Sequence, residues 1–266
     1  MTMNDGQGWI GPDSLSNEAY HAMDGLSSSN LKDLLKSPRH YQHRLKKGNQ
    51  QTDARRIGTL THTATLEPEV FKRTVRESPK FDKRTKAGKE AFHAFHASLP
   101  AGTQLLAPKD FDMVSAMAES VRSQADLTGI EAEVSGFCRL RDYGNVTAKI
   151  RPDAMLGTTI MDLKTCKDCS ERAVFYSIRD WKYHVSAAWY MMIANLLDRE
   201  IDKFQWIFVE KTAPYGVRVY NAGINMLRQG QEECITALKR YVWSASQDDW
   251  ECYDPQPIDI DFREDD

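Results

Sequence analysis

The stretch RPDAMLGTTIMDLKT, from Arg151 to Thr165, decides both the fold and the chemistry predicted for this chain. Its second half is apolar enough for a buried strand but contains an acid and a lysine. Side chains alternate between the two faces of a strand, so Ile160, Asp162 and Lys164 share one face. A carboxylate and an ammonium group therefore point into the same space.

Asp153 comes just before a Gly-Thr turn and can approach this strand from the adjoining segment. Two carboxylates beside a lysine suit a magnesium ion and a phosphate. An Asp-x-Lys sequence alone is also a common surface ion pair. However, Glu131 and Glu133 lie at the start of the preceding predicted hairpin, and clustered acids repel each other unless a cation compensates them. The pattern therefore predicts a metal site that handles phosphate.

The composition predicts one compact domain. The chain has 266 residues, of which 41 % are hydrophobic, enough for a sizeable core. Its five cysteines show no secreted disulfide rhythm, and the N-terminus has no basic region followed by an apolar run, so we expect a reduced, cytoplasmic protein. No apolar run approaches the roughly 18 residues of a membrane span, and there is no phosphate-binding loop for ATP.

The net charge of −3 is unevenly distributed. Residues 248–266 contain nine acids and one arginine, which gives −8 and leaves +5 for residues 1–247. A basic main body is compatible with a polyanionic partner. The acidic tail is either a solvated end or a docking segment for a partner or a neighbouring subunit.

Hydrophobic periodicity divides the chain into elements. We expect residues 1–25 to be a flexible lead-in, residues 26–247 to be a single domain and residues 248–266 to be an acidic tail. Predicted helices cover residues 26–41 (ended by Pro38), 54–66, 110–125, 171–179, 184–197 and 222–244. Predicted strands cover residues 131–140, 145–150, 158–164, 203–210 and 216–221. The small residues of 58–62 suggest a close approach by another backbone. The order αβββαβ predicts an α/β fold with a central mixed sheet.

A basic stretch from Phe71 to Glu90 carries eight Lys or Arg against three acids. Pro79 and Gly88 predict that it is rich in loops. It could follow a phosphate backbone or be an ordinary solvated loop. The candidate DNA-binding residues in it are Lys80, Lys83, Arg84 and Lys86.

Six segments together resemble one nuclease family. They are residues 26–41 (LSSSNLKDLLKSPRHY), 57–68 (IGTLTHTATLEP), 133–135 (EVS), 152–153 (PD), 162–165 (DLKT) and 183–190 (YHVSAAWY). The set resembles the RecE-like (exonuclease VIII) exonucleases of the PD-(D/E)XK nuclease superfamily. This resemblance implies the αβββαβ nuclease core, flanked by helices, with an N-terminal helical elaboration.

The resemblance also implies roles for individual residues. Metal binding, by Mg²⁺ with Mn²⁺ as a substitute, would involve Asp153, Asp162, the backbone carbonyl of Leu163 and His62. Lys164 would orient or activate the attacking water, and Glu133, with Glu131 as the fallback, would complete the acidic cluster. Tyr183 and Tyr190 would contact DNA, whereas Ser186 stands where relatives usually carry a glutamine.

The implied activity is 5′ to 3′ degradation of linear double-stranded DNA in recombination and repair. The 3′ single strand would pass to a RecT-like annealing protein, and the enzyme would form a ring of three or four copies, encoded by a bacterium, phage or prophage. The alternatives are a structure-specific or restriction-type endonuclease and an inactive DNA-binding subunit. An iron–sulfur cluster at Cys166 and Cys169 is not expected, because the other three cysteines are scattered.

Overall fold

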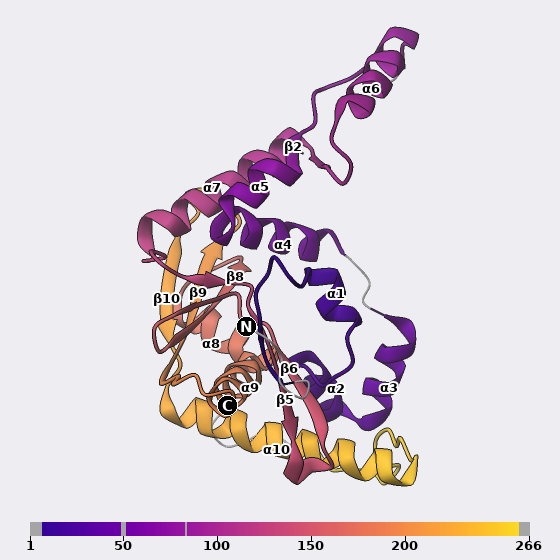
Figure 1. The fold of residues 1–266 in the computed structure, drawn as a ribbon, viewed down its shortest axis with the longest axis vertical. Helices are drawn as coiled ribbons and strands as arrows, with labels where there is room; N and C mark the ends of the chain where they lie inside the picture. Colours follow the sequence, from indigo (N-terminus) through magenta and orange to yellow (C-terminus); the bar gives the residue numbers. More distant parts are fainter. Residues whose placement is uncertain (1–6, 49–51, 83, 261–266) are drawn as a thin grey trace.

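The computed structural model describes residues 7–48, 52–82 and 84–260 of the chain. At its centre lies a five-stranded sheet with the order β10-β9-β8-β7-β4 (Figure 1). Its strands are β4 (Glu131–Ala132), β7 (Ala154–Leu156), β8 (Thr159–Cys166), β9 (Lys203–Glu210) and β10 (Val217–Asn221). Strand β8 runs parallel to β9 and all other neighbours are antiparallel, so the sheet is mixed as predicted.

A three-stranded sheet adjoins the central one and has the order β1-β5-β6. It contains β1 (Gly8–Ile10), β5 (Ser135–Leu140) and β6 (Val146–Ile150), with the short 3-10 turn η1 (Arg141–Tyr143) joining the last two. This hairpin was predicted from its two-residue periodicity. A small parallel pair, β2 (Val75–Glu77) and β3 (Gln104–Leu106), lies apart from both sheets.

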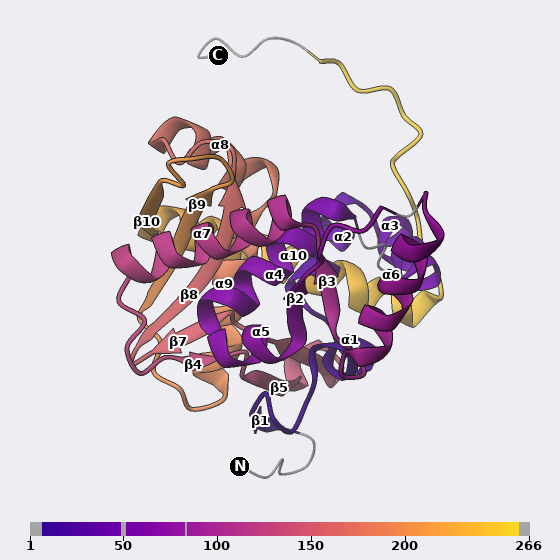
Figure 2. The ribbon, with the colours of Figure 1, turned by 90° about the horizontal axis from the view of Figure 1, so that it is seen from above.

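Helices cover both faces of the central sheet (Figure 2). On one face, α4 (Asp53–Leu66) and α7 (Pro108–Gln124) pack over Met161, Leu163 and Ile207. On the other, α9 (Tyr183–Leu196) and α10 (Ile224–Gln247) pack over Ile160 and neighbouring aromatic residues. The remaining helices are α1 (Asn17–Ala22), α2 (Ser28–Lys36), α3 (Pro38–Lys47), α5 (Pro68–Thr74), α6 (Lys86–Ser98) and α8 (Glu171–Asp180). The predicted α/β fold with a central mixed sheet flanked by helices is confirmed.

The N-terminal segment is more structured than its composition predicts. Strand β1 pairs with β5, and α1 is capped by Ser16, so the description of residues 1–25 as a lead-in is wrong for the part that the structure describes. Trp9 and Tyr20 are both buried. These two aromatic residues anchor the segment because each removes a large apolar surface from water.

Pro38 separates two helices and begins the second one. Helix α2 ends at Lys36, and Ser37 caps α3 by accepting a hydrogen bond from the backbone N–H of His40. Proline is well tolerated at the first position of a helix, where its missing N–H would have no partner. The predicted end of the first helix at Pro38 is confirmed, whereas the second helix, α3, was not predicted.

Helix α6 projects from the body as an arm (Figure 1). The prediction of a mainly loop segment up to Glu90 is wrong, because α6 starts at Lys86 and includes Gly88. Thr85 caps the helix by accepting a hydrogen bond from the N–H of Gly88 at 3.0 Å. Aromatic rings of Phe81, Phe92 and His96 pack on one another within the arm.

The acidic tail begins with packed residues. Trp250 contacts the rings of Tyr41 and Tyr241, and Arg39 donates its N–H to the carbonyl of Glu251 at 2.9 Å. Residues 251–260 are exposed, and Figure 2 shows this end leaving the body. Within the described residues, no helix has the length and apolarity needed to cross a membrane.

Candidate active site

The side chains of strand β8 alternate between the two faces of the sheet, as the two-residue periodicity predicted. Ile160 belongs to the core under α9 and α10, whereas Met161 and Leu163 belong to the core under α4 and α7. Asp162 and Lys164 lie on the Ile160 face, where Lys164 Nζ is 2.5 Å from Asp162 Oδ2. The same ammonium group donates to the carbonyl of Leu163 at 3.3 Å.

The acidic cluster forms where the long hairpin passes from one sheet to the other. Pairs on both sides of this break, Ala132 with Ala154 and Gly136 with Ile150, follow one continuous register. Glu133 consequently lies opposite Asp153, and its N–H donates to the Asp153 carbonyl at 3.1 Å. Directly opposed residues of an antiparallel pair are close neighbours. The register thus brings two carboxylates together.

Glu133, and not Glu131, belongs to this cluster. Its backbone has a φ of 54°, in the left-handed region, which breaks the strand between Ala132 and Ser135. Glu131 lies away from the site and binds Arg199 with both carboxylate oxygens, the first at 2.5 Å. The expectation that these two acids share one face is wrong, because the kink ends the regular alternation.

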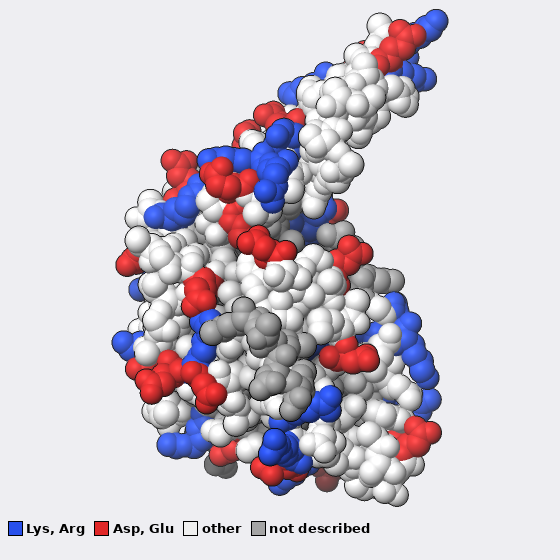
Figure 3. Space-filling view, viewed as in Figure 1, with Lys and Arg blue, Asp and Glu red and all other residues white. Residues whose placement is uncertain are grey.

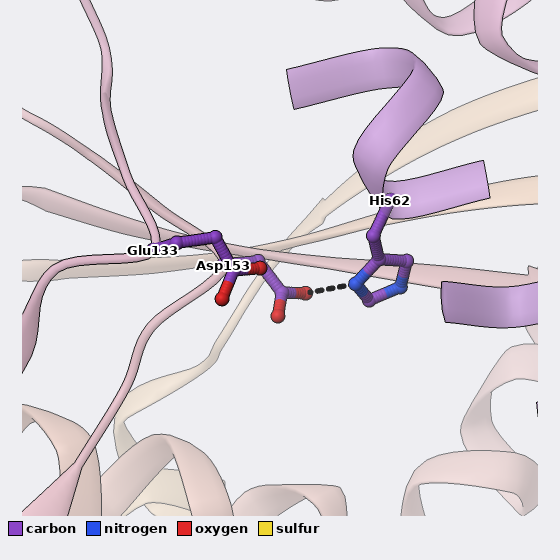
Figure 4. Close-up of side chains that lie close together, drawn as sticks. All are labelled: His62, Glu133 and Asp153. Atoms are coloured by element: carbon purple, nitrogen blue, oxygen red, sulfur yellow. Dashed lines mark ion pairs between the residues drawn. The ribbon is translucent and has the colours of Figure 1, made fainter. Parts of the chain in front are cut away.

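His62 completes the cluster from helix α4. Its Nδ1 lies 3.4 Å from Asp153 Oδ2, and Figure 4 shows the imidazole pointing from the helix toward Asp153 with Glu133 beside it. Each of the three side chains offers one ligand atom, and these atoms lie within 4.8 Å of one another. Leu163 N–H donates to Asp153 Oδ2 at 2.7 Å, which fixes the carboxylate against β8.

The donor set of this cluster fits a divalent metal. One imidazole nitrogen and two carboxylates converge within the span of a coordination sphere, a combination that Mg²⁺ and Mn²⁺ share with other divalent ions. Asp162 lies on the adjoining strand, but its Oδ2 and the Leu163 carbonyl both contact the ammonium of Lys164. The structure therefore gathers His62, Glu133 and Asp153 directly, and places the other two predicted ligands around the lysine.

Neighbouring charges set the pKa values of Asp153 and Lys164. Burial by itself would raise the pKa of Asp153, but the charges of His62 and Lys164 lower that pKa to about 2. Burial would lower the pKa of Lys164, yet the nearby carboxylates, Asp162 first, raise it above its ordinary value. At neutral pH Asp153 is therefore an ionised oxygen donor and Lys164 is a cation.

Two cationic side chains of the site, those of Arg151 and Lys32, were not predicted from the sequence. Arg151 is buried and donates from Nε to Glu133 Oε2 at 2.8 Å, so it orients that carboxylate. Lys32, on α2, lies with its Nζ 5.3 Å from the ring centroid of Tyr183. The sequence carries no signal for Lys32, because it lies at the edge of the apolar stripe formed by Leu31, Leu34 and Leu35, where a lysine is ordinary.

The predicted DNA-contacting residues of α9 occupy different positions around the site. Tyr183 is half-buried, and Lys164 Nζ lies 5.3 Å from its ring centroid. Tyr190 is also half-buried, and burial is the main reason that its pKa lies above the ordinary value. Ser186 is buried, with 8 % of its surface exposed, which leaves little room for a direct contact with DNA.

The basic residues predicted to bind DNA lie on the projecting arm, away from the acidic cluster. Lys80, Arg84 and Lys86 are exposed, whereas Lys83 lies outside the described residues. Arg84 pairs with Asp82 at 2.9 Å. Figure 3 shows Lys and Arg at the base and along the arm, mixed with acidic side chains.

The fold and the acidic cluster beside a strand lysine define a PD-(D/E)XK nuclease-like protein. More specifically, the chain belongs to the family of PDDEXK-like domains of unknown function designated DUF3799, whose family model matches residues 27–253. The relationship to PD-(D/E)XK nucleases predicted from the six segments is confirmed.

One solved structure shares the fold, and a second one is less similar. A candidate exonuclease from Eubacterium rectale superposes with a TM-score of 0.61 at 14 % sequence identity, over 94 % of this chain and 89 % of that one. A phage-related exonuclease from Haemophilus somnus gives a TM-score of 0.38 at 13 % identity, over 86 % of this chain and 98 % of that one. No curated protein sequence matches the chain.

Proposed function

We propose that this protein is a Mg²⁺-dependent exonuclease that degrades linear double-stranded DNA from its 5′ ends. The observation that carries the proposal is the convergence of His62, Glu133 and Asp153 next to the Asp162–Lys164 pair. The family membership supports a nuclease. The name of the Eubacterium rectale structure favours an exonuclease over an endonuclease.

The side chains of the site have separable tasks. Asp153, held by the N–H of Leu163, presents a fixed anionic oxygen, while Arg151 aligns Glu133. A divalent cation held there would polarise the scissile phosphate and lower the pKa of a bound water. Lys164 acts as a cation that orients the water or steadies charge on the phosphate, since its raised pKa keeps it protonated at neutral pH.

The proposed biological context follows from the RecE-like resemblance. The 3′ single-stranded product would serve a RecT-like annealing protein in recombination, and a ring of three or four copies would enclose the DNA. The ring would let the arm of each copy reach DNA that enters the site. The size of the assembly is measured directly by light scattering on the purified chain.

Linear and covalently closed duplexes of the same sequence test the reaction type. With Mg²⁺, the proposal predicts digestion of the linear form only, release of nucleotides from a 5′ label before a 3′ label, and no reaction in EDTA. Cutting of the closed form would identify an endonuclease. Absence of cleavage of either form with Mg²⁺ or Mn²⁺ would contradict the proposed enzyme and favour a DNA-binding subunit.

Asp162→Asn is the matched inactive variant. It keeps the side-chain shape while removing the charge that faces Lys164. We expect loss of cleavage with retained folding and retained DNA binding. Full activity in this variant would contradict the assignment of the site.

A further inference from the structure

Lys32 brings a second ammonium group to the catalytic strand. It lies one turn into α2, and its Nζ is 5.3 Å from the centroid of the Tyr183 ring. Lys164 Nζ lies at the same distance from the same ring. The two lysines therefore come from different elements, α2 and β8, and meet around one tyrosine. Cation–π attraction to the ring compensates part of their mutual repulsion.

Lys32 has no carboxylate within ion-pair distance among residues 7–48, 52–82 and 84–260. Asp162 is the acid whose charge acts on it most, but that carboxylate is already bound by Lys164 at 2.5 Å. Burial is the largest influence on Lys32, followed by the charge of Lys164, and together they lower its pKa to about 8. A half-buried cation without a counterion destabilises the folded protein.

The charge pattern around Lys32 indicates what would compensate it. Lys164 is matched by Asp162, and Arg151 is matched by Glu133, whereas no carboxylate among the described residues forms an ion pair with Lys32. An ammonium group is a compact charge with three donors, well suited to the oxygens of a phosphate. A metal ion would instead be repelled by this position.

We propose that Lys32, held over the ring of Tyr183, forms a subsite for a phosphate group of the DNA strand, adjacent to the phosphate that is cut. This inference rests on the proposed nuclease function, since it takes the ligand to be DNA. The phosphate is either an internal phosphodiester or the terminal 5′ phosphate of the duplex. Lys32 is thus a substrate-binding residue: it lowers the stability of the free protein and raises its affinity for DNA.

Binding of a labelled duplex in EDTA tests the subsite without any cleavage. Fluorescence anisotropy at several salt concentrations gives both the affinity and the slope of log K against log salt. For Lys32→Gln we expect affinity about tenfold weaker, the size of one charge-assisted contact. The slope should fall by about 0.9, the value for one lost phosphate contact with duplex DNA. Lys32→Arg, which keeps the charge, should restore the slope.

Thermal unfolding separates this role from a structural one. Because Lys32 lacks a counterion in the free protein, Lys32→Gln should unfold at an equal or higher temperature than the wild type.

Lys36→Gln is the matched control, since Lys36 is an exposed lysine one turn further along the same helix. It removes the same charge, and we expect it to leave the affinity and the slope unchanged. If Lys32→Gln fails to fold, Lys32→Met, which keeps the apolar stem, takes its place.

Duplexes with 5′-phosphate and 5′-hydroxyl ends identify the source of the phosphate. An equal loss of affinity on both supports an internal phosphodiester, and a loss confined to the phosphorylated duplex supports the terminal phosphate. An unchanged affinity and slope on both duplexes would overturn the subsite, as would a lowered unfolding temperature that Lys32→Arg does not correct. If the wild type binds DNA through Lys32 but cleaves neither linear nor closed DNA, the subsite stands and the proposed exonuclease fails.

Discussion

The backbone N–H of Leu163 donates a 2.7 Å hydrogen bond to Asp153 Oδ2, which ties the catalytic strand to the bend of the preceding hairpin. Because of this bond, Asp153 cannot rotate away from β8 without leaving a buried N–H without a partner. His62 approaches the same oxygen from helix α4. One carboxylate therefore joins the central sheet, the hairpin and a helix at the candidate metal site.

Glu133 and Glu131 form a matched pair for testing the metal site. Glu133→Gln should weaken Mg²⁺ or Mn²⁺ binding by more than about tenfold, because even outer-shell changes have effects of that size. Glu131→Gln should leave metal binding unchanged and lower stability by at most about 1 kcal/mol, as its partner Arg199 lies in a partly exposed ion pair. Isothermal titration with the metal measures both variants, and equal affinities would remove Glu133 from the site.

Arg151 should act on metal affinity through Glu133. Arg151→Met keeps much of the side-chain volume but removes the 2.8 Å bond that orients the carboxylate. We expect metal affinity to fall by about 10- to 100-fold. Leu15 and Ser135 also accept hydrogen bonds from Arg151, so unfolding must be monitored in parallel. Unchanged metal affinity in a folded variant would contradict the orienting role.

The arm should contribute non-specific DNA affinity. Replacing Lys80, Arg84 and Lys86 together by glutamine should reduce the salt slope of duplex binding by up to about 3, or about 0.9 for each phosphate contact. Arg84 is paired with Asp82, so its share should be the smallest. Anisotropy titrations over a salt series provide the measurement.

A charge-matched triple variant elsewhere on the surface controls for net charge. Lys203, Arg228 and Lys239 are exposed residues of β9 and α10 and can be replaced in the same way. If this second variant loses as much affinity and slope as the arm variant, the arm is an ordinary solvated segment.

Glu233 should make stability depend on acid pH. Burial alone would raise the pKa of Glu233, but hydrogen bonds from Lys182 and His184 lower it below its ordinary value of 4.5. The stabilisation, roughly 1 kcal/mol, is fully present above pH 4.5 and is lost as the pH falls through the folded-state pKa.

Glu233→Gln should therefore destabilise the protein at pH 7, and its difference from the wild type should shrink as the pH falls below 4.5. Glu232→Gln, at the exposed neighbouring position, is the control. Melting temperatures between pH 3.5 and 7 provide the comparison. A pH-independent difference between Glu233→Gln and the wild type would refute the ion-pair explanation.

Two helical glycines should respond to alanine in opposite directions. A Cβ at Gly230 would lie 2.4 Å from the carbonyl oxygen of His184, so Gly230→Ala should cost about 1–3 kcal/mol through overpacking of α9 against α10. A Cβ at Gly58 would meet nothing within 4 Å, so Gly58→Ala should stabilise α4 by about 0.5–1 kcal/mol. Urea unfolding measures both changes, and a shared sign would contradict the packing argument.

The open space at Gly58 also corrects an expectation from the sequence. The small residues of 58–62 suggested a close approach by another backbone, but the close approach occurs at Gly230. A glycine in a helix is compatible with either environment, and only the neighbouring element decides between them. The burial of Trp9 and Tyr20 was likewise not predictable from the sequence pattern. The strand β1 and the helix α1 that carry them are too short for a hydrophobic periodicity to mark them.

The elements of the nuclease core were predictable because their periodicity is local. Alternation from Ile160 to Lys164 predicted the two faces of β8, and the hairpin and long helices follow the same kind of pattern. The arm was not predictable in this way, since α6 buries no residue and Gly88 argues against a helix. Its helix is specified by the Thr85 cap, a weaker signal than a hydrophobic stripe.

That an acid and a lysine share one face of a buried strand follows from the amino-acid order alone, because successive side chains of a strand alternate between its faces. Tertiary structure alone decided which other groups join them. Glu133 enters and Glu131 does not, because the hairpin keeps its register through a left-handed kink at Glu133. His62 arrives on α4, which packs on strand β8, and Lys32 arrives on α2, which packs against α9 and α10. Such packing depends on contacts between segments far apart in the chain.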